Sequence, residues 1–214
     1  MSSKGLERLA PLAGVVFVVL IVIGVAIAGE TPDNEDSTAS IVRYWTENDS
    51  QQILGSSIGA WATLFFVWFA GSLRSELRRG ERGEDRLASI SFGGALISAM
   101  GFLLILGLDF GLADSAGDIP PGAVHTMTVL SNELFFPLAA GFALFLLAAG
   151  VGALRSGVLP PWGAWLAIVI GIACVTPIGF FALLLGFIWV LVMSIALFFR
   201  GRAAAAPGPV LPGA

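Results

Sequence analysis

The sequence predicts an all-α integral membrane protein, a bundle of six transmembrane helices with the N-terminus and the C-terminus in the cytoplasm. Three observations support this fold class. The chain of 214 residues is 57% hydrophobic and 12% charged, its uncharged intervals match the thickness of a bilayer, and its basic residues gather in alternate loops.

The composition excludes several other classes of protein. A soluble domain is about one quarter charged, because its surface faces water. High hydrophobicity argues against a disordered chain or a coiled coil, and a single cysteine argues against a disulfide scaffold. With 11 basic against 15 acidic residues, the chain is not a nucleic-acid binder. We therefore expect the lipid bilayer, and no nucleic acid, as a partner.

Charge-free intervals define the transmembrane spans. A helix needs about 20 apolar residues to cross a bilayer core of roughly 30 Å. Four intervals of 21 to 24 uncharged residues lie between Arg8 and Glu30, Asp49 and Arg74, Arg86 and Asp109, and Glu133 and Arg155. They are continuously apolar, whereas membrane strands alternate in polarity, so helices are expected.

The last interval must fold back on itself. It holds 44 uncharged residues before Arg200, about twice the length of one span, and its strongest helix breaker is Thr176-Pro177-Ile178-Gly179. A hairpin there gives six spans in one domain over residues 1–202, followed by a flexible cytoplasmic tail over 203–214. The spans are expected at residues 10–28, 52–73, 87–112, 130–154, 161–176 and 179–199.

The orientation follows from the basic residues, which favour cytoplasmic loops. With the N-terminus inside, ten of the eleven cations lie in the cytoplasm and only Arg43 lies outside. The first span also resembles a signal peptide, because Ala26-Ile27-Ala28 matches a cleavage site. Its apolar stretch is long for that role, which favours an uncleaved anchor.

The outer loop over 29–51 begins with an acidic run and then changes pattern. Ser37 is a suitable N-cap, and Ile41, Tyr44 and Trp45 recur at helical spacing. We expect a short interfacial helix with Tyr44 and Trp45 as anchors at the lipid headgroups. The acidic run itself is interpreted as a solvated, negatively charged outer loop. The alternative is that the run binds a divalent cation, but its acids lack the spacing of an EF-hand.

The inner loops carry a second set of anchors and a basic turn. Trp162 and Trp165 follow Pro161, which suits a first helical turn, and are expected at the inner headgroup level. The turn from Arg74 to Arg86 mixes five arginines with four acids. Basic residues there can attract anionic lipid, but the acids reduce that attraction, which favours a role in topology alone.

Small residues mark close helix contacts. Three ridges are formed by Gly55 and Gly59, by Gly94 and Ser98, and by Gly163, Ala167 and Gly171. They serve either packing within the chain or contact with a second copy or a membrane-protein partner. The spacing does not distinguish these two roles.

Polar residues at the outer boundary form the candidate ligand-binding site. Asp109 ends the third span, Asn132 and Glu133 begin the fourth, and Thr176 lies at the hairpin. Because the fifth span rises only about 22 Å, a polar recess open to the outside is predicted beside these residues. The alternative is that Asn132 and Glu133 merely cap a helix and that Asp109 is a boundary residue.

The chain has few residues that could form a haem site, a zinc site or a catalytic site in a membrane. Haem or zinc sites need several His or Cys ligands, and the chain has one histidine, His125, and one cysteine, Cys174. The chain has no catalytic motif, so we expect no enzyme, no catalytic residue, no metal and no cofactor.

Three segments resemble a family of six-span membrane proteins of high-GC bacteria that is defined as a domain of unknown function. They are Thr31-Pro32-Asp33 to Tyr44, the Arg-rich turn after Phe69-Ala70-Gly71-Ser72-Leu73, and Leu159-Pro160-Pro161-Trp162-Gly163-Ala164-Trp165-Leu166. The resemblance implies a multi-pass protein of the bacterial plasma membrane and supplies no activity. We expect a structural, accessory or partner-binding bundle. The alternative is a small transporter or channel with an outward recess near Asp109 and Glu133.

Overall fold

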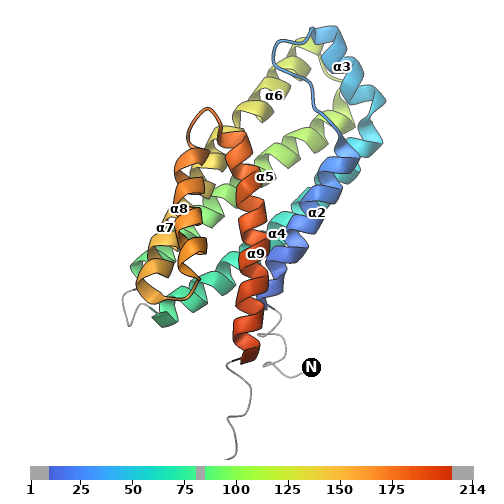
Figure 1. Ribbon diagram of the computed structural model, residues 1–214. Helices are drawn as coiled ribbons and strands as arrows, with labels where there is room; N and C mark the ends of the chain where they lie inside the picture. The colour runs from blue at the N-terminus through green and yellow to red at the C-terminus, as the bar shows by residue number, and fades with distance from the viewer. Residues whose placement is uncertain (1–9, 81–84, 204–214) are drawn as a thin grey trace, which may run out of the picture.

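The computed structural model describes residues 10–80 and 85–203 of the chain. It is all-helical, with 87% of residues in helices and no strand among the described residues (Figure 1). A short 3-10 helix, η1, precedes eight α-helices. Their bounds are η1 Ala10–Leu12, α2 Ala13–Ala28, α3 Thr38–Glu47, α4 Asp49–Gly80, α5 Arg86–Ser115, α6 Pro121–Glu133, α7 Phe135–Ser156, α8 Pro161–Cys174 and α9 Gly179–Ala203.

Five helical segments in the described part of the chain are long and apolar enough to cross a membrane. They are Ala10–Ala28, Asp49–Gly80, Arg86–Ser115, Pro121–Ser156 and Gly179–Arg200. The fifth expected span corresponds to α8, whose 14 residues rise only about 21 Å. Helix α8 is therefore too short to cross alone, and Figure 1 shows the turn between α8 and α9 below the level of α3 and α6. Of the expected tail, Ala203 ends α9 and the rest lies outside the described residues.

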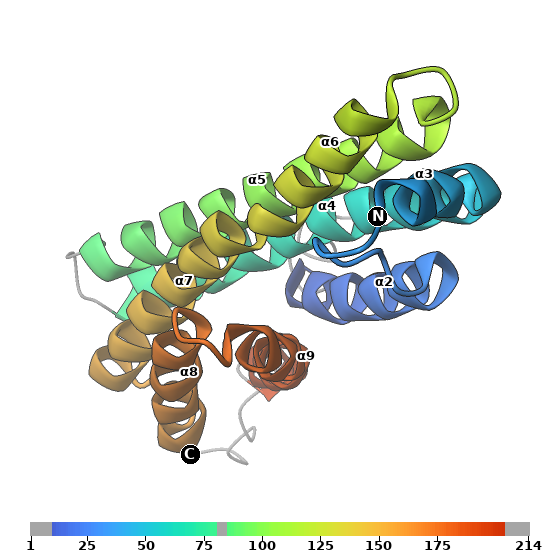
Figure 2. The ribbon, with the colours of Figure 1, turned by 90° about the horizontal axis from the view of Figure 1, so that it is seen from above.

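The helices enclose an aromatic core. Each helix packs on the next in the order α2, α4, α5, α7, α8 and α9, and α9 in turn packs on α2 (Figure 2). Phe17 of α2 packs on Phe66 of α4 and on Phe187 of α9, with ring centroids 5.0 and 5.3 Å apart. Phe142 and Phe145 of α7 complete this cluster. Phe102 of α5 packs against Phe17 and Phe187, so five of the helices contribute rings to the interior of the bundle.

The predicted ridges of small residues all pack inside the chain. A Cβ atom at Gly55 of α4 would lie 3.0 Å from the carbonyl oxygen of Gly24 in α2. One at Gly171 of α8 would lie 3.1 Å from the carbonyl oxygen of Ala143 in α7. These glycines are used for close helix approach within one copy of the chain.

Helices α5 and α7 approach each other closely at two glycines. A Cβ atom at Gly94 of α5 would lie 2.4 Å from the backbone nitrogen of Phe145, and one at Gly141 of α7 would lie 2.4 Å from the backbone nitrogen of Ser98. Backbone therefore faces backbone at this crossing. A side chain at either glycine would force the two helices apart.

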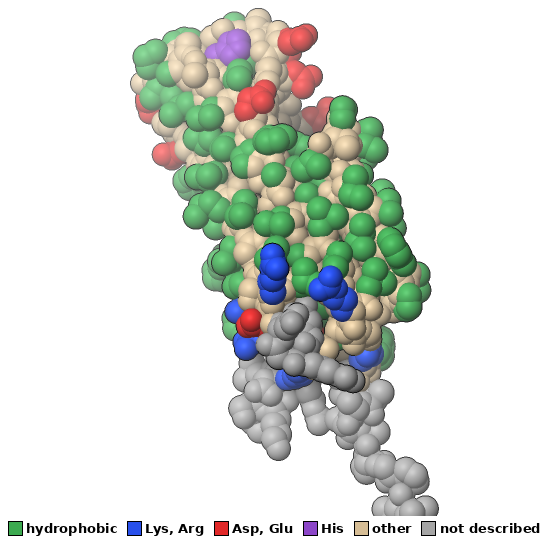
Figure 3. Space-filling view, turned by 90° about the vertical axis from the view of Figure 1, so that its left-hand side faces the viewer, with side chains coloured by type: hydrophobic (Ala, Val, Ile, Leu, Met, Phe, Trp, Pro, Cys, Tyr) green, Lys and Arg blue, Asp and Glu red, His purple; other side chains and the backbone are tan. Residues whose placement is uncertain are grey.

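The two ends of the molecule carry side chains of opposite charge. Acidic side chains gather at one end and arginines at the other, with an apolar surface between them (Figure 3). We call the described residues of 74–86 together with Arg155 and Arg200 the basic end. The cap consists of residues 29–51 and 109–133 and carries ten acidic residues and Arg43.

The cap has a hydrophobic core of its own. Ile41 and Trp45 of α3 pack with Leu112 and Ala113 of α5 and with Val124 of α6, separately from the aromatic core of the bundle. The helix predicted after Ser37 is present as α3, and Ser37 accepts a hydrogen bond from the backbone N–H of Ser40.

The helical segment expected from residue 130 begins earlier, at Pro121, because α6 packs against α3 in the cap. From Pro121 to Ser156 the segment has 36 residues, or about 54 Å. It therefore exceeds a roughly 30 Å bilayer core by a wide margin, and the excess belongs to the cap.

Candidate functional site

A tryptophan joins α3 to α6 at the centre of the cap. Trp45 is 1% exposed, and its indole Nε1 donates a hydrogen bond to Oγ1 of Thr128 at 2.9 Å. Thr128 in turn donates to the carbonyl oxygen of Val124 at 3.0 Å. The ring of Trp45 is thus buried rather than exposed, as an anchor at the lipid headgroups would be, because α6 covers the ring and supplies the polar partner for its N–H.

The loop between α2 and α3 is tied to α6 by side-chain hydrogen bonds. Asn132 Nδ2 donates to the carbonyl oxygen of Pro32 at 3.2 Å and to Oδ1 of Asn34 at 2.8 Å. Asn34 Nδ2 donates to Oε1 of Glu133 at 3.2 Å. The two amides therefore bridge the loop to the end of α6.

His125 makes a second connection about two turns nearer the start of α6. Its Nδ1 lies 2.8 Å from Oγ1 of Thr38, and its Nε2 lies 3.4 Å from the carbonyl oxygen of Asn34. Because a carbonyl oxygen only accepts, Nε2 carries the proton in the second contact, and the Thr38 hydroxyl then donates to Nδ1 in the neutral ring. His125 therefore orients the start of α3.

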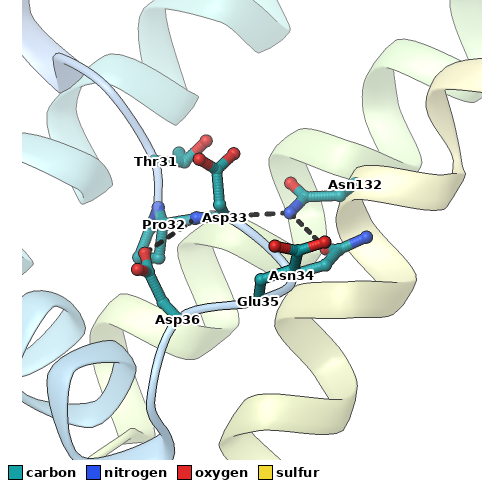
Figure 4. A pocket seen from close by; sticks show the side chains of 7 residues that line it. All are labelled: Thr31, Pro32, Asp33, Asn34, Glu35, Asp36 and Asn132. Atoms are coloured by element: carbon teal, nitrogen blue, oxygen red, sulfur yellow. Dashed lines mark hydrogen bonds between the residues drawn. The ribbon is translucent and has the colours of Figure 1, made fainter.

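These connections frame an open recess of about 760 Å³ in the cap. Asn132 forms one wall, and the loop forms the rest (Figure 4). The backbone N–H of Asp33 donates to Oδ2 of Asp36 at 3.0 Å and so closes the loop into a turn. The lining residues are Thr31, Pro32, Asp33, Asn34, Glu35, Asp36 and Asn132.

The structure separates the four residues of the predicted ligand site. Asn132 lines the recess, whereas Glu133, beside it, accepts from Asn34. Asp109 accepts a hydrogen bond from Ser131 Oγ at 2.7 Å and does not line the recess. Thr176 lies in the turn between α8 and α9, where its hydroxyl donates to the carbonyl oxygen of Ala173 at 2.7 Å. Only Asn132 and Glu133 are thus brought to the loop.

Tyr44 lies at the base of the cap. Gln52 Nε2 donates to the Tyr44 hydroxyl and to the carbonyl oxygen of Ala28. Burial raises the pKa of Tyr44, and the carboxylate of Asp109 raises it further. Tyr44 is therefore half-buried among polar groups, while the other predicted anchors, Trp162 and Trp165, are 57% and 59% exposed.

Several residues of the recess and its surroundings were not predicted as a site. In the recess, Asn34 connects Asn132 to Glu133, and beside it Thr38 pairs with His125. The available signal was the turn-forming acidic run after Pro32, which we interpreted as a solvated loop. Among the described residues, no group of three His, Cys, Asp or Glu side chains is placed to hold a metal ion.

The bundle below the cap contrasts with it in polarity. The buried polar side chains of the described bundle are all uncharged and are Gln52, Ser56, Thr63, Ser91, Ser98 and Ser194, while Thr128 and Ser131 belong to the cap. Buried charges usually mark ion pathways through a membrane. Polar surface suited to binding is concentrated in the cap, where carboxylates and carbonyls can accept hydrogen bonds from a ligand or from a basic partner.

Comparison of the chain with family models, with curated proteins and with solved structures gives no match.

Proposed function

We propose that this chain is a six-span protein of a bacterial plasma membrane and that it acts as a partner-binding helix bundle, with its cap outside the cell. Both termini lie in the cytoplasm in this arrangement. The proposal rests chiefly on one contrast, a closed aromatic interior below a polar recess in the cap.

The distribution of charge supports the orientation. Six described arginines lie at the basic end, whereas the cap holds ten acidic residues and Arg43. Lysine and arginine favour cytoplasmic loops of membrane proteins. In the proposed topology α8 is the fifth span and turns back into α9 before it reaches the outer surface.

The filled interior favours binding over transport. Phe66 lies 5.9 Å from Phe142 and 5.5 Å from Phe145, measured between ring centroids, so rings from α4 and α7 meet in the middle of the bundle. A hydrated path would need polar or charged groups along it. Asp33, Glu35 and Asp36 suit a partner that presents basic or amide side chains to the cap.

Site-specific photocrosslinking in intact membranes tests this proposal. A photoreactive amino acid at Asp33, in the recess, is expected to give one discrete heavier species, which is either a partner or a second copy. The same amino acid at Asp114, which is also exposed and acidic but lies outside the recess, is the matched control. Equal products at both positions, or none at Asp33, would contradict binding at the recess.

The recess itself favours a second candidate, a small outward-facing transporter or channel. Its volume of about 760 Å³ lies within the range of small-molecule pockets, about 300–1,000 Å³. A screen of solutes by thermal shift would test this candidate, with Asn132→Ala, which changes the wall of the recess, and Glu133→Gln beside it as variants. A solute that stabilises the wild type and neither variant, and that the wild type carries into proteoliposomes, would support it, whereas a screen that finds no solute and no flux would argue against it.

A further inference from the structure

Arg74 differs from Arg78 and Arg79, its two neighbours near the end of α4. Arg78 Nε lies 3.3 Å from Oδ2 of Asp85, and Arg79 Nη1 lies 2.6 Å from Oε1 of Glu76. The acids of the described part of this turn are therefore taken by these two arginines. Arg74 has no ion pair with any described residue.

The groups around Arg74 satisfy its guanidinium only in part. Nη2 donates to Oγ of Ser89 across a long 3.4 Å, and the guanidinium carbon lies 5.4 Å from the ring centroid of Phe92. Nε is buried and has no hydrogen-bond partner among the described residues. A guanidinium has five N–H donors, so most of the donor capacity of Arg74 is unused.

Arg74 also lies deeper along its helix than its neighbours. It precedes the end of α4 at Gly80 by six residues, or about 9 Å along the axis. Arg78 and Arg79 are exposed near that end, whereas Arg74 is half-buried between α4 and α5. Of the three described arginines in α4, Arg74 therefore lies closest to the apolar surface of the bundle.

The surface above Arg74 is apolar and open. Gly71 lies one turn before Arg74 in α4, and a Cβ atom there would meet only Phe92, at 3.9 Å. Phe92 is half-buried, and Leu96, one turn further along α5, is 44% exposed. A hydrocarbon chain can therefore lie along Gly71 and Phe92 directly above the guanidinium.

Arg74 is a partly buried cation without an acidic partner among the described residues, and such a group calls for an anion. Guanidinium groups bind phosphate through paired N–H donors. At the edge of a bilayer the phosphate that comes with hydrocarbon chains is that of a phospholipid, and anionic lipids are attracted by basic residues at this level.

We propose that Arg74 and Ser89 bind the phosphate of an anionic phospholipid, whose acyl chains lie against Gly71 and Phe92. This site lies at the basic end, opposite the recess of the cap. It does not depend on the partner-binding function, and either can fail while the other holds.

Binding of defined lipids to the purified full-length protein tests the site. The protein in neutral detergent is titrated with phosphatidylglycerol, and bound lipid is counted by native mass spectrometry. We expect Arg74→Gln to weaken binding at least about fivefold, since one basic residue at a membrane surface contributes about 1 kcal/mol. Arg79→Gln, which removes an exposed arginine paired with Glu76, is the matched control and should bind as the wild type does.

Two further probes test whether binding needs both the negative charge and the acyl chains of the lipid. Phosphatidylcholine, which has no net charge, should bind more weakly than phosphatidylglycerol, and glycerol phosphate should not compete at equal concentration. If Arg74→Gln does not fold, Ser89→Ala keeps the charge of Arg74 and should still weaken binding. Equal affinity of Arg74→Gln and the wild type, equal affinity of Ser89→Ala and the wild type, or full competition by glycerol phosphate would each overturn the proposal.

Discussion

Replacing Trp45 by alanine should loosen the cap and leave the bundle intact. The ring is 1% exposed and belongs to the hydrophobic core of the cap, which is separate from the aromatic core. Truncation of a buried tryptophan costs about 3–5 kcal/mol. Of this, about 0.5–1.5 kcal/mol is the hydrogen bond to Thr128.

Hydrogen exchange of the backbone amides shows which helices lose this stability in the Trp45→Ala variant. Because each 1.4 kcal/mol is about a factor of ten, amides of α3 should lose protection by about 10²- to 10³-fold or more. Amides of α7 around Phe142 should change little. Trp68, which is 63% exposed on α4, is the control, and Trp68→Ala should leave both regions within about threefold of the wild type.

Two outcomes would refute this reasoning. If Trp45→Ala lowered protection equally in α3 and α7, the cap and the bundle would unfold as one unit. If it changed protection in neither helix, Trp45 would not hold the cap together.

Two other predictions concern the bundle and Tyr44. Gly141→Ala should destabilise the α5–α7 crossing by up to about 2 kcal/mol, because overpacking costs about 1–3 kcal/mol and the gain in helix propensity is about 1 kcal/mol. Gly107→Ala, where a Cβ meets nothing within 4 Å, should be neutral or stabilising in the same detergent unfolding assay, and equal losses would contradict the close approach. Tyr44, the single tyrosine, should titrate above its ordinary pKa of about 10 in ultraviolet difference spectra, and less so in Asp109→Asn. Since the folded pKa is raised, its contribution to stability is complete below about pH 10 and is lost as the pH rises through the folded value. An ordinary midpoint for Tyr44 would show that its ring is not buried.

The sequence predicts the helices well because their signals are local. Charges bracket the apolar segments, and Ser37 with its following residues marks the start of α3. Helix spacing also places Asp109 and Ser131 at one level, where a 2.7 Å hydrogen bond joins them. Each of these inferences needs only the order of residues and the geometry of a helix.

The cap was harder to predict because its contacts are distant in sequence. Trp45 and Thr128 are 83 residues apart, and Asn34 and Asn132 are 98 apart. An amphipathic helix beside a membrane has the same pattern whether its apolar face meets lipid or another helix. Nothing local distinguishes an interfacial Trp45 from a buried one.

Pairing within the basic turn shows the same limit. The sequence interleaves arginines with acids, which predicts a mutually neutralised loop. The structure assigns Asp85 to Arg78 and Glu76 to Arg79, and it leaves Arg74 facing Ser89 and Phe92. The sequence gives the number of charged residues in the turn. Which arginine pairs with which acid depends on the directions of the side chains, which only the structure shows.

Labelling of single cysteines with a membrane-impermeant thiol reagent tests the central claim most directly, that a closed bundle separates an outer cap from an inner basic end. The background is Cys174→Ala, which removes the single cysteine. We predict that Asp33→Cys is labelled in intact cells, that Arg79→Cys is labelled only after permeabilisation, and that Thr63→Cys, at a position 0% exposed within the bundle, is labelled in neither. Labelling of Asp33→Cys and Arg79→Cys from the same side, or of Thr63→Cys in intact cells, would contradict the account.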